Sequence, residues 1–132
     1  MADPLEKLLV RAEDLNRDLL GRVLEGRVRI DADTGRIVPG QGWAKLSPRR
    51  RILLYLLARK AATALGILAE GETAGPKVVE TDTGVKAGTV RRSLRELLDE
   101  GLLAQDAKRG YYVPPYALEQ VSALITEEKS HG

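Results

Sequence analysis

The sequence predicts a mainly α-helical protein with small β-hairpins. Apolar residues recur at helical spacing along several stretches, and two pairs of short alternating stretches surround glycine-containing turns. The 132 residues are enough for one domain with a real core and too few for two of ordinary size. We therefore expect one helical core with smaller elements added at its ends.

The first predicted helix begins near the N-terminus and runs to about Leu24. Asp3 suits the N-cap, Pro4 suits the first turn, and Glu6 is placed to return a hydrogen bond to the cap. Apolar residues follow at spacings of three and four, at Leu5, Leu8, Ala12, Leu15 and Leu19. The stripe persists for only about two heptads, so it indicates either packing on the chain's own core or a homodimer contact.

A β-hairpin is predicted next. Two alternating stretches, 27–31 and 36–38, flank a turn. Asp31 and Asp33 resemble the start of a calcium loop, but the oxygen ligand at the fifth position is missing and Gly42 stands where the closing glutamate would fall. We therefore expect a plain turn and no metal site.

A long helix is predicted from Ser47, because serine caps a helix N-terminus and Pro48 fits its first position. The helix continues to about Leu65. Its apolar residues cover most of the circumference, which is typical of a helix buried on more than one side.

Three arginines, Arg49, Arg50 and Arg51, occupy the first turn of that helix. Each is disfavoured there by about 0.3–1 kcal/mol, because the helix dipole is positive at its N-terminus. Two explanations stay open. The arginines hold a phosphate beside the helix N-terminus, or they form ion pairs with Asp31, Asp33 or a glutamate of the first helix.

Two shorter helices follow. Pro76 fits the start of the first, near Lys77, and Gly84 lets the chain leave it through a left-handed conformation. The second is predicted from about Lys86 until Gly101 stops it. The residues of this second helix divide by face: Val90, Leu94, Leu97 and Leu98 share one side, Arg92 and Arg95 project from the other, and Arg91 lies at the edge.

A second hairpin with a basic tip comes after this helix. An extended segment begins at Leu102–Leu103 and returns at Tyr111, after a loop that carries Lys108 and Arg109.

The region resembles the winged helix-turn-helix superfamily, particularly small archaeal-type transcription regulators. The matching positions are Gly84, Val85, Thr89, Val90, Arg91, Arg92, Leu94, Leu97, Gly101 and Leu102. The resemblance implies a winged helix-turn-helix domain at 43–128, preceded by a helix and hairpin extension at 1–42 and followed by a tail at 129–132. One position departs from the pattern: Glu80 stands where such domains have a small residue, so we expect a rotated helix, or a carboxylate that reaches solvent or an arginine.

The resemblance also implies double-stranded DNA as the partner and a transcription regulator or chromatin-associated factor as the role. The residues expected in the major groove are Lys86, Thr89, Arg91, Arg92 and Arg95. The residues expected on phosphates are Lys108, Arg109, Arg49 and Arg50. An alternative is a winged domain that binds protein inside a transcription, replication or ribonucleoprotein assembly.

A last amphipathic helix is predicted after Pro114–Pro115. Its apolar residues are Tyr116, Ala117, Leu118, Val121, Leu124 and Ile125. The helix either covers the core or pairs with its two-fold mate in a homodimer.

Composition narrows the function classes. The formal charge of +2 means that a nucleic-acid site must come from local clustering of cations. Cysteine is absent and the only histidine is His131, so we expect no thiolate zinc site and no cofactor. An enzyme is the third function class, and we expect none, because only carboxylate or lysine chemistry is left and no paired carboxylates accompany a phosphate-binding glycine loop. We also expect a cytoplasmic protein without a membrane segment, and the scarcity of Asn and Gln is thermophile-like.

Overall fold

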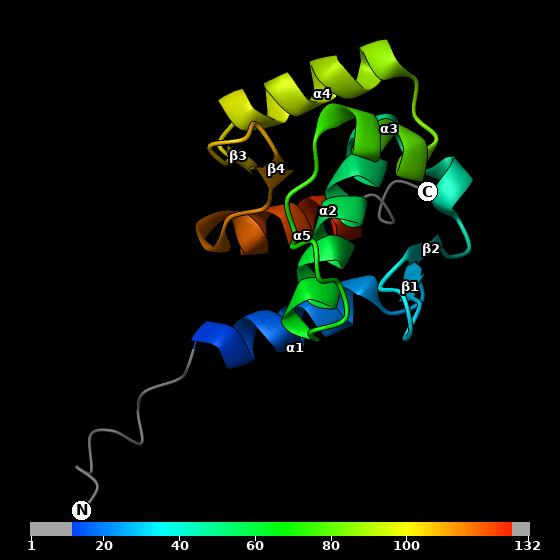
Figure 1. The fold of residues 1–132 in the computed structure, drawn as a ribbon, viewed down its shortest axis with the longest axis vertical. Helices are drawn as coiled ribbons and strands as arrows, with labels where there is room; N and C mark the ends of the chain where they lie inside the picture. Colours follow the sequence, from blue (N-terminus) through cyan, green and yellow to red (C-terminus); the bar gives the residue numbers. More distant parts are fainter. Residues whose placement is uncertain (1–11, 128–132) are drawn as a thin grey trace, which may run out of the picture.

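The computed structural model describes residues 12–127 and shows a mainly helical protein with two small antiparallel hairpins (Figure 1), which confirms the predicted class. The predicted helix start at Asp3 and Pro4 lies outside the described residues. The elements in chain order are α1 (Ala12–Leu24), β1 (Val28–Ile30), β2 (Ile37–Pro39), η2 (Trp43–Lys45), α2 (Pro48–Ala64), α3 (Pro76–Thr83), α4 (Ala87–Asp99), β3 (Ala104–Gln105), β4 (Tyr111–Tyr112), η3 (Pro115–Ala117) and α5 (Leu118–Glu127).

Helix α2 is the centre of the molecule. The Ser47 hydroxyl accepts a hydrogen bond from the backbone N–H of Arg50, and Pro48 occupies the first turn, as predicted. All residues from 52 to 59 are buried. Helices α1, α3, α4 and α5 all contact α2, with α4 above it and α1 below it in Figure 1. The prediction of a helix buried on more than one side is confirmed.

The hairpin β1–β2 pairs Val28 with Pro39 and Ile30 with Ile37. Its turn closes on itself, because the Asp31 carboxylate accepts hydrogen bonds from the backbone N–H groups of Asp33 and Thr34, at 2.8 and 3.0 Å. These donors hold the pKa of Asp31 below its usual value. The turn is therefore held by hydrogen bonds within the hairpin, and the absence of a metal site stays a prediction.

Helices α3 and α4 meet at Gly84, whose φ of 76° is the left-handed conformation that the sequence predicts. The strand after α4 begins later than expected. The N–H groups of Leu102 and Leu103 both bond back to the Leu97 carbonyl and both side chains are buried, so β3 starts at Ala104.

Strand β4 pairs with β3 on one side and with Ala74 on the other. Ala74 and Tyr111 exchange two backbone hydrogen bonds, of 2.8 and 3.0 Å, which tie the segment before α3 to the second hairpin. The sequence pattern contained no signal for this pairing of Ala74 with β4.

A buried arginine fixes the same segment from the other side. Arg59 is only 6% exposed and donates to the carbonyls of Gly71, Glu72 and Thr73 at 3.0–3.3 Å. It also donates to the Tyr55 hydroxyl, which in turn donates to the Asp82 carboxylate. Burial is the main reason that the pKa of Tyr55 is raised. The network joins α2, the loop after it and α3.

The two flanking helices pack on the chain itself. On α1, Leu20, Val23 and Leu24 are buried, and α5 buries an apolar face against α1 and α2. The expected apolar role of Tyr116 is wrong: this side chain is 74% exposed, because Pro114–Pro115 start a 3₁₀ turn that directs Ala117 inward. In the part of the chain described, no helix is long and apolar enough to cross a membrane.

Candidate nucleic-acid interface

Helix α4 has an apolar inner face and a basic outer face. Val90, Leu94 and Leu97 have no exposed surface, which fixes the rotation of the helix on α2. Because these three anchor one side, the cations of the opposite side are held outward. Lys86, Arg91, Arg92 and Arg95 are all exposed, and Thr89 is half-buried.

The tip of the second hairpin is a closed turn. The Asp106 carboxylate accepts hydrogen bonds from the backbone N–H groups of Lys108, at 3.0 Å, and Gly110, at 2.7 Å. The Asp106 N–H bonds to the Gly110 carbonyl at 2.9 Å. Lys108 and Arg109 are exposed at the tip, so the turn presents two cations on a defined backbone.

Arg109 adopts a left-handed backbone conformation, with φ of 64°, that residues other than glycine rarely adopt. Replacing Arg109 by glycine is expected to give a protein about 1 kcal/mol more stable than Arg109→Ala, because only alanine keeps a Cβ in this conformation. Both variants lose the same charge. Chemical unfolding measures the difference, and equal stability of the two variants would contradict the strain at Arg109.

The cations of α4 and of the hairpin tip share one electrostatic property. Among the residues that the structure describes, none of them has a carboxylate partner or a hydrogen bond from its charged group. They are Lys86, Arg91, Arg92, Arg95, Lys108 and Arg109. Their charges are therefore available to a ligand without first breaking an ion pair in this part of the chain.

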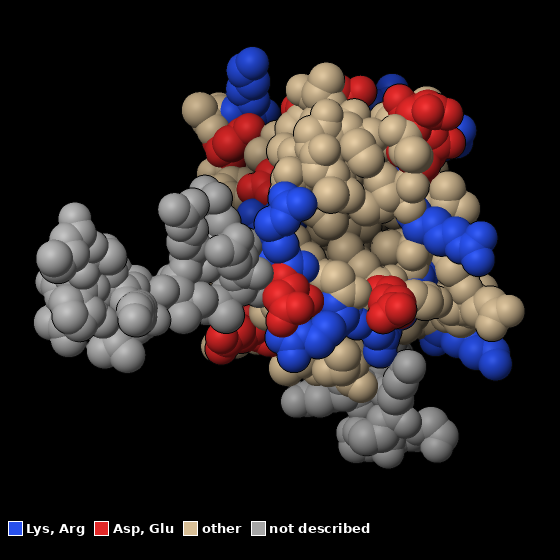
Figure 2. All heavy atoms as spheres, turned by 90° about the horizontal axis from the view of Figure 1, so that it is seen from below, with Lys and Arg blue, Asp and Glu red and all other residues tan. Residues whose placement is uncertain are grey.

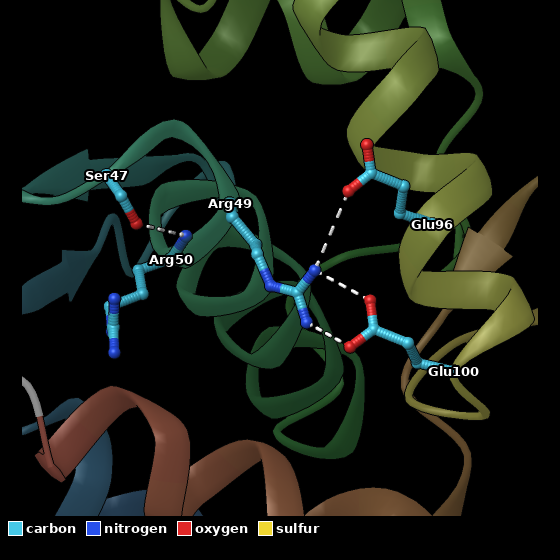
Figure 3. Close-up of polar contacts among 5 residues, drawn as sticks. All are labelled: Ser47, Arg49, Arg50, Glu96 and Glu100. Carbon is cyan, nitrogen blue, oxygen red and sulfur yellow. Dashed lines mark hydrogen bonds and ion pairs between the residues drawn. The ribbon is translucent and has the colours of Figure 1, made fainter.

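The arginines in the first turn of α2 differ from these. Arg49 forms a two-pronged contact with the Glu100 carboxylate and lies 3.9 Å from a Glu96 oxygen (Figure 3). Arg50 donates from Nε to the Leu124 carbonyl at 3.0 Å, and Arg51 donates to two carbonyls of η2 at 2.8 and 3.1 Å. The first turn of α2 thus contacts α4, α5 and η2.

These contacts correct the expected ion-pair partners. Ion pairing with Asp31, Asp33 or a glutamate of the first helix was one of the two explanations left open for the three arginines. For Arg49 the carboxylates come instead from Glu96 of α4 and from Glu100, which caps its C-terminal end. The reason is tertiary, because α2 packs on α4 and brings its first turn beside the acidic end of that helix. A phosphate contact by Arg49 or Arg50 stays a prediction.

Replacing Glu100 by glutamine is expected to lower the free energy of unfolding slightly at neutral pH, since exposed ion pairs contribute about 0.2–1 kcal/mol. The hydrogen bonds from Arg49 hold the pKa of Glu100 below its usual value of 4.5. The contribution is therefore present above pH 4.5 and is lost as the pH falls through the lowered pKa. Urea unfolding of both proteins across this range measures it; a difference that survives full protonation would speak against the pair.

Glu80 lies half-buried on α3, beside the buried residues Val79 and Thr83. The described residues offer its carboxylate no ion-pair partner. Of the expected alternatives, partial access to solvent is the one that the geometry shows.

The face that carries α1 has a different charge pattern. In Figure 2, which views the molecule from below, Lys and Arg side chains alternate with Asp and Glu around an uncharged area. On α4 the signs are separated along the helix: the cations come first, and Glu96, Asp99 and Glu100 occupy the end. The positive charges of α4 therefore all precede its negative charges along the helix.

Comparisons of the chain with models of known families, with curated proteins and with solved structures find no match.

Proposed function

We propose that the protein is a winged helix-turn-helix DNA-binding protein and that it acts as a transcription regulator or chromatin-associated factor. The observation that carries the proposal is the set of exposed cations on α4 and the hairpin tip that have no partner within the described chain. The order of α2, the Ala74 bridge, α3, α4 and the β3–β4 hairpin supports the fold assignment.

Helix α4 has the form that suits a DNA major groove. A groove about 12 Å wide accepts one α-helix, and arginine can donate two hydrogen bonds to the edge of a guanine. Arg92 and Arg95 are exposed on the outer face and would read base edges, with Lys86, Thr89 and Arg91 beside them. Lys108 and Arg109 would contact the phosphates of the adjacent backbone.

The test is an equilibrium titration of the full chain with labelled duplex DNA at several salt concentrations. The expected result is that the logarithm of the association constant falls linearly with the logarithm of the salt concentration. The slope should be about −0.9 for each phosphate contact. No binding to any duplex at low salt would overturn the proposal. It would favour the protein-contact alternative, which rests on the exposed carboxylates Glu96 and Asp99 of the same helix.

A two-fold homodimer remains a separate proposal. It would place two recognition helices about 34 Å apart on a palindromic site. Leu20, Val23 and Leu24 of α1 and Leu118, Val121 and Ile125 of α5 are buried within the chain, so a dimer contact through the N-terminal or the C-terminal helix would use other residues of these helices. Light scattering at micromolar concentration, with and without DNA, measures it.

A further inference from the structure

The short turn η2 lies at one end of the candidate interface. The indole N–H of Trp43 donates to the carbonyl of Thr83, the last residue of α3, at 3.4 Å. Thr83 immediately precedes the connection to α4. Figure 1 shows η2 beside this connection, at the end of α4 that is remote from β3 and β4.

A second contact holds η2 against α2. The Arg51 guanidinium donates to the carbonyls of Trp43 and Ala44, at 3.1 and 2.8 Å. The turn is entered through Gly42, with φ of 82°. Because η2 is tied to both α2 and α3, its backbone position is set by the same helices that set α4.

Lys45 is the exposed cation of this fixed turn. It has no ion-pair partner among the residues that the structure describes. Exposure alone would not assign a role to Lys45. However, the turn η2 that carries it is anchored beside the start of α4, where Lys86 is also exposed.

From this geometry we infer that Lys45 is a phosphate contact that flanks the N-terminal end of α4, opposite the hairpin tip. The inference rests on the proposed function. A helix in the major groove has a phosphate backbone on each side. The hairpin with Lys108 and Arg109 follows the C-terminal end of α4, and η2 supplies a cation beside the other end. The protein would then hold the DNA backbone at both ends of one helix.

Lys45→Ala tests the inference, with Arg36→Ala as the matched control. Arg36 is also exposed and without an ion-pair partner in the described chain. It follows Gly35, which lies against the backbone of Ile67 just after the C-terminal end of α2, whereas η2 contacts the first turn of α2. Each variant removes one positive charge, so a general effect of net charge is the same in both.

The expected result is a salt slope reduced by about 0.9 in Lys45→Ala, with affinity at 0.1 M salt lowered about eightfold for every duplex sequence. Arg36→Ala should keep the wild-type slope. Trp43→Phe, which removes the indole N–H and keeps an aromatic ring, should make the further change Lys45→Ala less costly. A purely structural role of Lys45 would leave the slope unchanged.

Three other outcomes would overturn the inference, and the first of them would also overturn the proposed function. If the wild-type chain binds no duplex, the proposed function fails and this inference with it. If the wild-type chain binds and Lys45→Ala has the wild-type slope, the inference alone is overturned. If both single variants lower the slope equally, the effect is one of net charge and the assignment of Lys45 is overturned as well.

Discussion

Replacing Leu94 by alanine is expected to destabilise the protein by about 2–5 kcal/mol. Leu94 has no exposed surface and lies on the inner face of α4, which packs on α2. Truncation removes buried methyl groups and leaves a cavity between two helices that are themselves fixed by other contacts, so the site collapses only in part. The free energy of unfolding in urea measures the loss.

Leu65→Ala is the matched control. Leu65 is 53% exposed just after α2, so the same chemical change should cost much less there. DNA affinity, corrected for the folded fraction, should be unchanged in Leu94→Ala. Equal losses of stability at the two leucines would mean that α4 does not depend on this packing.

The helices and hairpins could be predicted from the sequence because their signals are local. Ser47 and Pro48 start α2, Gly84 ends α3, and the spacing of Val90, Leu94 and Leu97 defines the buried face of α4. Each signal involves residues within about one or two helical turns, which is the range over which periodicity and capping act. The same periodicity predicts correctly that Arg92 and Arg95 are exposed.

The sequence did not reveal the contacts between residues that lie far apart in the chain. Arg49 and Glu100 are 51 positions apart, and Arg50 and Leu124 are 74 apart. No local pattern specifies such pairs, because they depend on how α2 packs on α4 and α5. For the same reason the burial of Arg59 against three loop carbonyls was missed, although an arginine inside an apolar helix face is a signal that a buried partner is present.

The contacts of the arginines with neighbouring elements separate two sets of arginines within the predicted site. The first turn of α2 holds neighbouring elements, with Arg49 on α4, Arg50 on α5 and Arg51 on η2. The arginines of α4 form no ion pair with any residue that the structure describes. Substitutions in the first set should therefore change stability, and substitutions in the second set should change binding.

The double variant Arg92→Ala/Arg95→Ala is expected to lose DNA affinity by at least about thirtyfold, because each base-edge contact by arginine contributes about 1–3 kcal/mol. Its free energy of unfolding should change by less than about 0.5 kcal/mol, since both side chains are exposed. Fluorescence anisotropy with a labelled duplex and urea unfolding measure the two quantities on the same preparations.

Two further double variants separate groove contacts from charge. Arg29→Ala/Arg36→Ala removes two exposed arginines from the hairpin β1–β2 and should retain most of the affinity. Arg92→Lys/Arg95→Lys keeps both charges but replaces the rigid planar fork of each guanidinium by a flexible ammonium group, so it should bind DNA with reduced discrimination between sequences. If the lysine variant discriminates as well as the wild-type chain, Arg92 and Arg95 act on phosphates, and the bases are read by other residues.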